Sequence, residues 1–154
     1  MIQTSPATRE TLMSMSGLAF LEAILDGQIT AASIGPTMGF HLSHVAQGSA
    51  TFEGSPRDHV TNPMGTVHGG WYGTILDSAM GCAVMTTLPA GALYTTLEYK
   101  VNIIKPIPLG TVVLASAHVQ HAGRSTAIAN GELRGKDDEK LYATASTTCI
   151  IMKG

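Results

Sequence analysis

The hydrophobic pattern of the chain is most regular between residues 62 and 88. From Thr66 onward, apolar residues recur at every fourth position in two neighbouring rows, which predicts a long α-helix. The first row contains Val67, Trp71, Ile75, Ala79 and Ala83, and the second contains Tyr72, Leu76, Met80, Val84 and Leu88. Because residues 62 to 88 contain no Lys, Arg or Glu, most of the helix circumference is expected to be buried. The pattern therefore predicts a central helix enclosed by the rest of the domain.

The remaining face of this helix carries small residues around a single carboxylate. A spacing of 100° per residue places on it Gly70, Gly73, Thr74, Asp77 and Gly81. Interior glycines cost a helix about 1 kcal/mol each relative to alanine, and a buried carboxylate is unfavourable without partners. One interpretation is that another element packs closely on the glycines, while a nearby hydroxyl or backbone group satisfies Asp77. We favour the alternative, in which this strip lines a functional site.

The start of the helix offers a second functional element. His68, Gly69 and Gly70 lie in its expected first turn, where backbone N–H groups have no acceptor within the helix and the helix dipole is positive. Glycine allows a ligand oxygen to approach these amides closely. The segment is therefore a candidate donor for a carbonyl oxygen that gains negative charge during nucleophilic attack.

Helix geometry decides how these two elements can cooperate. Asp77 lies eight residues beyond Gly69, which corresponds to about 12 Å along the axis. One carbonyl group cannot contact both residues of the same helix. A shared reaction centre would need two chains, with the helix start of one protomer facing Asp77 of the other. An isologous dimer provides two such sites.

Alternating apolar and polar residues predict strands on both sides of the helix. Residues 39–53 form a hairpin around 46–48, and 54–65 is a loop that leads into the helix. The clearest alternation runs from Thr95 to Ile103, and three further strands are expected at 111–121, 124–134 and 140–152. About six strands with one long helix between the second and third indicate an α+β fold. A short helix between Ser16 and Gly27 is expected to pack on this body.

Composition limits the class of protein. A chain of 154 residues that is 44% hydrophobic and 13% charged is expected to form one domain over residues 1–154, with 1–13 mobile or loosely docked. A net charge of −2 argues against a nucleic-acid partner. Without a signal-peptide pattern or an apolar run of 18 residues, we expect no membrane association and a cytoplasmic location. Cys82 and Cys149 are expected to be buried free thiols.

The histidines do not predict a metal site. His41 and His44 lie three residues apart on one expected strand, and His118 and His121 lie three apart on another. Regular alternation would place the members of each pair on opposite faces, where they cannot share a metal.

Two motifs in the helical segment resemble the signature of hot-dog fold acyl-CoA thioesterases of the phenylacetate-degradation-related (PaaI-like) type. They are Asn-Pro-Met-Gly-Thr-Val-His-Gly-Gly at 62–70 and Leu-Asp-Ser-Ala-Met-Gly at 76–81. Residues 97–106 also resemble this family, so the likeness covers about 16–152. It implies an antiparallel sheet of about six strands wrapped around the helix, an acyl-CoA substrate and a site shared by two protomers. It further implies a homodimer that assembles into a homotetramer, and no cofactor besides the coenzyme A of the substrate.

The resemblance also implies roles for single residues. The Gly69 amide would polarise the thioester carbonyl, and Asp77 would act as general base or nucleophile. Asn62, seven residues before Gly69, would position substrate or water, although a turn residue before Pro63 is the alternative. His68 would support the loop by a hydrogen bond. Thr96 falls where related enzymes orient water with a hydroxyl group, and a simple strand-surface role is the alternative.

The sequence also contains candidates for binding the acyl group and the phosphates of the substrate. Gly70 and Gly81 belong to the small-residue strip, and Trp71 could contact the acyl group together with Tyr72 or Met80, or belong to the core. Lys105 and Arg124 are candidates for binding the phosphates of coenzyme A, with surface solvation as the alternative.

The sequence leaves three hypotheses for the function of the chain. Hydrolysis of an acyl-CoA thioester is the first hypothesis. A hot-dog dehydratase or hydratase would need a histidine and a carboxylate placed together, and His68 and Asp77 are nine residues apart in one chain. A non-catalytic acyl-CoA binding module would use the same pocket without turnover.

Overall fold

A computed structural model describes residues 7–154 of the chain. The elements in chain order are α1 (Arg9–Ser14), α2 (Gly17–Leu25), α3 (Ile34–Met38), β1 (Phe40–Ala46), β2 (Ser49–Gly54), a 3₁₀ turn η1 (Asp58–Val60), α4 (Gly69–Met85), β3 (Ala92–Ile103), β4 (Val113–Ala122), β5 (Thr126–Gly135) and β6 (Leu141–Lys153). The predicted six strands are confirmed, and so is the position of the long helix between the second and third.

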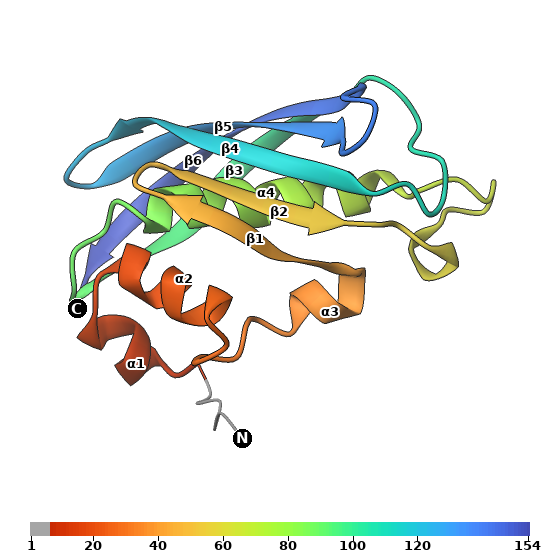
Figure 1. Cartoon of the computed structure of the whole chain (residues 1–154). Helices are drawn as coiled ribbons and strands as arrows, with labels where there is room; N and C mark the ends of the chain where they lie inside the picture. Colours follow the sequence, from red (N-terminus) through yellow and green to blue (C-terminus); the bar gives the residue numbers. More distant parts are fainter. Residues whose placement is uncertain (1–6) are drawn as a thin grey trace.

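The six strands form one antiparallel sheet in the order β1-β2-β4-β5-β6-β3. Figure 1 shows this sheet curving over α4, with α1, α2 and α3 grouped near β1. The two edge strands are β1 and β3, and β3 pairs only with β6. The predicted α+β arrangement of a sheet wrapped around a central helix is therefore confirmed.

The helix α4 provides the centre of the hydrophobic core. Ile75, Leu76, Ala79 and Met80 have no exposed surface, and they pack against the inward-facing residues of the sheet. This burial follows from the two apolar rows of the sequence. The helix begins at Gly69 rather than at Thr66, because residues 62–66 form a tight turn and Val67 pairs with Thr61 in an isolated bridge.

The described N-terminal residues form a short helix that contacts the rest of the domain. Thr8 caps α1 by accepting a hydrogen bond from the Thr11 amide, and the Met13 carbonyl accepts one from the Gly91 amide. These bonds place α1 against the connection between α4 and β3, and the expectation that residues 1–13 are mobile or loosely docked stays a prediction. Residues 1–6 of that expectation lie outside the described part of the chain. The short helix predicted between Ser16 and Gly27 is present as α2, and Ser16 caps it by accepting a hydrogen bond from the Ala19 amide.

Each pair of histidines lies on one face of the sheet, contrary to the sequence-based expectation. The register of β1 shifts between Leu42 and His44, so His41 and His44 lie opposite Glu53 and Thr51, two residues apart on β2. An extra residue in a strand reverses the alternation of faces beyond it. A shift between Val119 and His121 has the same effect on the second pair, His118 and His121.

The described residues contain neither a cluster of metal-binding side chains nor a membrane-spanning helix. Within 7–154, no three or more His, Cys, Asp or Glu side chains are grouped so that they could hold a metal ion. Across the same residues, no helix is both long enough and apolar enough to span a bilayer.

Candidate active site

A tight turn precedes the start of α4. The Asn62 side chain accepts hydrogen bonds from the Met64 and Thr66 amides at 3.0 and 3.3 Å, and its Nδ2 donates to Thr66 Oγ1 at 2.8 Å. Gly65 has φ +76°, a left-handed conformation that favours glycine. The structure therefore places Asn62 as the residue that closes this turn, and its predicted contact with substrate or water stays a prediction.

His68 was predicted to lie in the first turn of the helix, and it is the N-cap of α4, one position before the first helical residue. Its Nδ1 accepts a hydrogen bond from the Gly70 amide at 2.8 Å. The amide of the preceding residue, the exposed Gly69, has no acceptor among residues 7–154. An unpaired N–H at the positive end of a 17-residue helix can donate to an anionic oxygen. This arrangement fits the supporting role predicted for His68 and the donor role predicted for Gly69.

The glycines of α4 form the surface on which β3 packs. A Cβ atom added to Gly81 would lie 2.6 Å from Tyr94 Oη, and one added to Gly73 would lie 3.0 Å from Tyr99 Cε2. Gly69 lies against Ile103 in the same way, at 3.4 Å. The interpretation that we did not favour from the sequence is thus correct for Gly73 and Gly81. Glycine is needed there because aromatic rings of the strand occupy the space of a side chain.

Asp77 stands between these tyrosines. It is half-buried, and its Oδ1 accepts a hydrogen bond from Thr96 Oγ1 at 2.9 Å. The glycine-rich strip therefore presents one carboxylate to one hydroxyl group, between Tyr94 and Tyr99 on β3. Thr96 was predicted to be near the reaction centre, and its position beside Asp77 fits that role.

A bulge in β3 allows both Thr96, which bonds Asp77, and Tyr99 to face α4. Thr96 lies opposite Cys149 of β6 and Glu98 lies opposite Thr148, so Leu97 is an extra residue. The alternation of faces reverses at Leu97. Thr96 therefore points toward α4 on one side of the bulge, and Tyr99 does so on the other. Uninterrupted alternation, as the sequence suggested, would have put these two side chains on opposite faces.

Burial raises the pKa of Asp77 above its ordinary value, and the hydrogen bond from Thr96 partly offsets this effect. Ion pairs within residues 7–154 involve other carboxylates, so no cation stabilises the ionised Asp77. A carboxylate whose affinity for protons is raised is a better general base than an exposed one.

Other ionisable groups around Asp77 remain protonated near neutral pH. Burial and the neighbouring Asp77 raise the pKa of the Cys82 thiol to about 12. Burial also raises the pKa of Cys149, and it raises that of Tyr94 well above its ordinary value. Because a neutral thiol is a weak nucleophile, neither cysteine is suited to nucleophilic catalysis. Asp77 is the group of this cluster that can accept a proton.

The aromatic residues of α4 belong to the core. Trp71 is 1% exposed, and its Nε1 donates a hydrogen bond to the Met38 carbonyl at 2.8 Å. The Tyr72 hydroxyl donates to the Lys105 carbonyl and accepts from the Ile107 amide. Met80 is fully buried. The prediction that Trp71 contacts the substrate is therefore not favoured, because its side chain faces the interior.

The two basic candidates lie at opposite ends of the sheet. Lys105 lies two residues beyond the end of β3, whereas Arg124 lies in the β4–β5 turn. Both are exposed, and the turn that holds Arg124 adjoins the start of β3, because Thr126 pairs with Ile150 and Ile150 with Thr95. Within one chain they cannot bind the same pair of phosphates.

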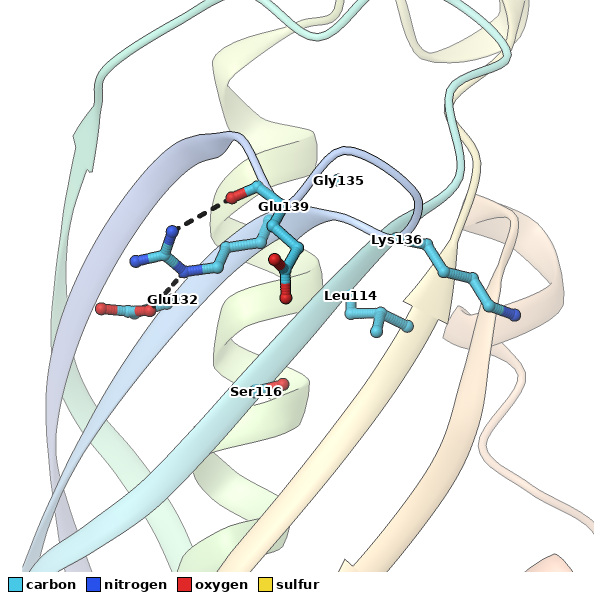
Figure 2. Close-up of a pocket in the computed structure, with 7 residues that line it drawn as sticks. Leu114, Ser116, Glu132, Gly135, Lys136 and Glu139 are labelled. Carbon is cyan, nitrogen blue, oxygen red and sulfur yellow. Dashed lines mark hydrogen bonds and ion pairs between the residues drawn. The ribbon is translucent and has the colours of Figure 1, made fainter.

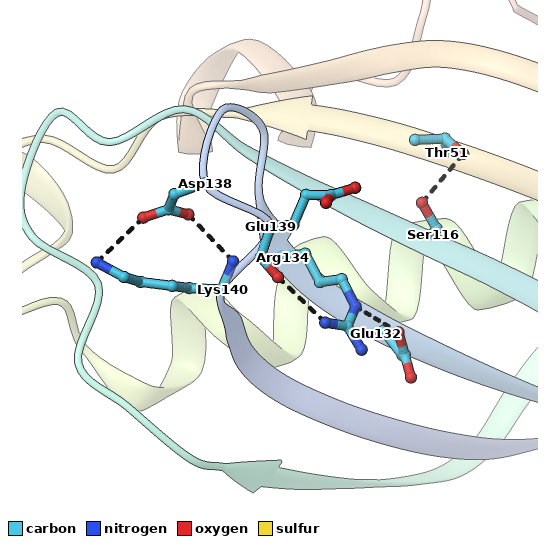
Figure 3. Close-up of polar contacts among 7 residues, drawn as sticks. All are labelled: Thr51, Ser116, Glu132, Arg134, Asp138, Glu139 and Lys140. Atoms are coloured by element: carbon cyan, nitrogen blue, oxygen red, sulfur yellow. Dashed lines mark hydrogen bonds and ion pairs between the residues drawn. The ribbon is translucent and has the colours of Figure 1, made fainter.

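One surface pocket lies away from Asp77, on the outer face of the sheet. It has a volume of about 130 Å³ and is lined by residues of β4, β5 and the β5–β6 turn. Figure 2 shows these side chains with α4 behind the sheet. Arg134 Nε pairs with Glu132 Oε2 at 2.8 Å and Arg134 Nη1 donates to the Glu139 carbonyl, as Figure 3 shows. These contacts are exposed to solvent, and they link β5 to the β5–β6 turn.

Comparisons with known proteins agree with this geometry. The family model of the thioesterase superfamily matches residues 64–142. Human acyl-coenzyme A thioesterase 13 is 27% identical over 148 residues, which is 96% of each chain. The structure of a phenylacetic acid degradation-related protein from Ralstonia eutropha is 30% identical with a TM-score of 0.77, covering 85% of this chain and 98% of that chain. The structure of a mutant of the phenylacetic acid degradation protein PaaI from Thermus thermophilus is 27% identical with a TM-score of 0.70. It covers 77% of this chain and 98% of the PaaI chain.

Proposed function

Because the chain belongs to the thioesterase superfamily, whose model matches residues 64–142, we propose that it hydrolyses acyl-CoA thioesters to a carboxylic acid and coenzyme A. The observation that carries this proposal is the half-buried Asp77, held by Thr96 on the same surface of the molecule as the unpaired Gly69 amide. The likeness to acyl-coenzyme A thioesterase 13 along 96% of the chain supports coenzyme A as the thiol.

The site needs two protomers that pair through β3. This strand is an edge of the sheet, and it exposes apolar side chains that water would otherwise surround: Leu97 at 58%, Tyr99 at 46% and Ile103 at 50%. Exposed apolar edge strands favour pairing with another strand. A second copy of β3, antiparallel to the first, would continue the sheet and cover these residues.

Such pairing would bring the helix start of one protomer and Asp77 of the partner subunit to the same position along the paired β3 strands. Gly69 packs beside Ile103, and Asp77 beside Thr96. If the twofold axis passes near Tyr99, midway between Thr96 and Ile103, Gly69 of one protomer comes level with Asp77 of the partner subunit. This overcomes the separation of about 12 Å within one helix. It also brings Lys105 of one protomer toward the end of the sheet that carries Arg124 of the partner subunit, which supports phosphate binding by both.

The proposed reaction uses these groups in sequence. The Gly69 amide donates to the thioester oxygen and stabilises the negative charge that develops on it. In the general-base form, Asp77 of the partner subunit accepts a proton from water as the water oxygen bonds to the carbonyl carbon. The tetrahedral intermediate collapses, the C–S bond breaks, and the thiolate takes a proton to give free coenzyme A. In the alternative form, Asp77 attacks directly and water hydrolyses the resulting anhydride.

The first experiment measures thiol release from acyl-CoAs that range from short aliphatic to phenylacetyl and hydroxybenzoyl. We expect turnover by the native protein and a loss of about 100-fold or more in a folded Asp77→Asn variant. Stabilisation by acyl-CoAs without thiol release would instead support a binding module. Hydration of crotonyl-CoA without thiol release would support the dehydratase alternative.

Assembly and location extend this proposal. We propose that two dimers associate into a tetramer, which the family likeness supports, and that the protein lies in the cytoplasm, which the lack of a signal-peptide pattern in the sequence supports. Sedimentation equilibrium tests the assembly, with a stable dimer as the contrary result.

A further inference from the structure

A buried hydroxyl group lies beside the bulge that turns Thr96 toward Asp77. Thr147 on β6 is 1% exposed, and its Oγ1 donates a hydrogen bond to the backbone carbonyl of Glu98 at 2.7 Å. Glu98 is the residue that follows the bulged Leu97 on β3. In a regular antiparallel pair, strand carbonyls bond to backbone N–H groups, and a bulge locally disrupts this ladder. The Thr147 hydroxyl therefore supplies a donor to β3 at the point of disruption.

Thr147 and Thr96 also share a neighbour. Thr147 and Cys149 are two buried residues of β6 on the inward face of the sheet, and Cys149 pairs with Thr96. Burial raises the pKa of the Cys149 thiol, whereas the hydroxyl groups of Thr96 and Thr147 beside it act in the opposite direction. Thr147, Cys149 and Thr96 thus form a row of neighbouring side chains. The row ends at Asp77, to which Thr96 donates its hydrogen bond.

We propose that Thr147 is a positioning residue, because its bond to the Glu98 carbonyl fixes the bulge in β3. The fixed bulge keeps Thr96 facing Asp77. This inference rests on the proposed thioesterase function, in which Asp77 accepts a proton, and it adds a residue that acts through Thr96 rather than on the substrate. A bulge that moved toward the start of β3 would turn Thr96 to the outer face, because successive side chains of a strand point to opposite faces.

The test measures the pKa of Asp77 in the full chain, from the pH dependence of its carboxyl carbon NMR signal, which Asp77→Asn assigns. We expect Thr147→Val to raise this pKa, because Thr96 would no longer favour the charged carboxylate. Under the proposed function, kcat should also fall about three- to tenfold, and the acidic limb of the pH–rate profile should move to higher pH. Thr147→Ser keeps the donor and should retain the native pKa and profile.

Two further variants separate positioning from a general loss of stability. Thr86 is the other buried polar residue in the part of the chain that the structure describes, and its hydroxyl also bonds to backbone groups. It caps the end of α4, nine residues beyond Asp77, so Thr86→Val should lower the melting temperature but keep the native pKa of Asp77. The double variant Thr96→Val/Thr147→Val should shift this pKa no further than Thr96→Val alone, because Thr147 acts through Thr96.

The outcomes separate this inference from the proposed function. A raised Asp77 pKa in Thr147→Val that Thr147→Ser restores supports the positioning role. A native pKa in folded Thr147→Val overturns it, as does an equal shift in Thr86→Val or a larger shift in the double variant. If Thr147→Val does not fold, Thr147→Ala removes the same hydroxyl and takes its place in each comparison. The titration needs no substrate, so a native protein without turnover defeats the proposed function and leaves this test intact.

Discussion

Thr96 Oγ1 donates a hydrogen bond to Asp77 Oδ1 at 2.9 Å, which joins the middle of the edge strand β3 to the middle of the central helix α4. The contact exists because Leu97 is bulged and the alternation of β3 reverses there. Burial and this hydrogen bond act in opposite directions on the carboxyl group, and burial has the larger effect.

Replacing Thr96 by valine should impair Asp77 without unfolding the protein. The lost hydrogen bond favoured the charged carboxylate, so the pKa of Asp77 should rise further, and the acidic limb of the pH–rate profile should move to higher pH. We expect kcat to fall about tenfold, because hydrogen bonds to charged groups contribute about 1.5–3 kcal/mol. Thr96→Ser keeps the donor and should retain the native profile. A native profile in Thr96→Val would show that the hydroxyl has no part in catalysis.

Asp77 should lower the stability of the fold at neutral pH. Because its pKa is raised in the folded state, the folded protein binds the proton more tightly than the unfolded chain. Protonation of Asp77 stabilises the folded protein fully at pH values below the pKa of Asp77 in the unfolded chain. This stabilisation is lost as the pH rises through the pKa of Asp77 in the folded protein. Asp77→Asn should therefore melt at a higher temperature than the native protein at pH 7, and the difference should shrink as the pH approaches 3. Equal melting temperatures at pH 7 would contradict this account of the carboxyl group.

Removing the Gly69 amide hydrogen should remove the proposed oxyanion donor. Gly69 is the first residue of α4, a position where proline is tolerated, and His68 before it is already extended with ψ 137°. We expect Gly69→Pro to fold and to lose about 100- to 1000-fold in kcat. Gly69→Ala is the matched control, because it keeps the N–H and its Cβ would make an ordinary contact with Ile103 at 3.4 Å. Equal losses in both variants would point to steric blockage instead.

Mixing two inactive variants should restore activity if each site uses two chains. A hybrid of Gly69→Pro and Asp77→Asn subunits contains one site in which both groups are native. After subunit exchange of an equal mixture, about one quarter of the native activity should return. Mixing either variant with itself is the control. If activity stays absent although native mass spectrometry detects hybrids, each site lies within one chain.

Gly17 is the position where an added methyl group should be costly for folding. It starts α2, and a Cβ atom there would overlap the backbone carbonyl oxygen of Met85. Since that neighbour is backbone, we expect Gly17→Ala to lower the free energy of unfolding by about 1–3 kcal/mol. Glu22→Ala, exposed on the same helix, should change it by about 0.5 kcal/mol or less. Urea denaturation measures both, and similar values would contradict the overlap.

Local periodicity was sufficient to predict most of the elements. The two apolar rows of α4 and the alternation in the strands are properties of short segments, and the elements that they predict are present. The helices α1 and α3 were missed because they span six and five residues, too few to show a period. The start of α4 was placed three residues early, because the apolar Val67 continues the helical row but belongs to the turn.

The sequence by itself determined that a long buried helix would carry a single charge, Asp77, and that glycines would stand at its start and along one face. Only the tertiary structure decided that Tyr94 and Tyr99 occupy those glycines, and that Thr96 reaches the carboxylate. The physical reason is that the faces of a strand follow from its register with its neighbour. The extra residue at Leu97 arises in the pairing of β3 with β6, two segments about fifty residues apart, and no local pattern contains it.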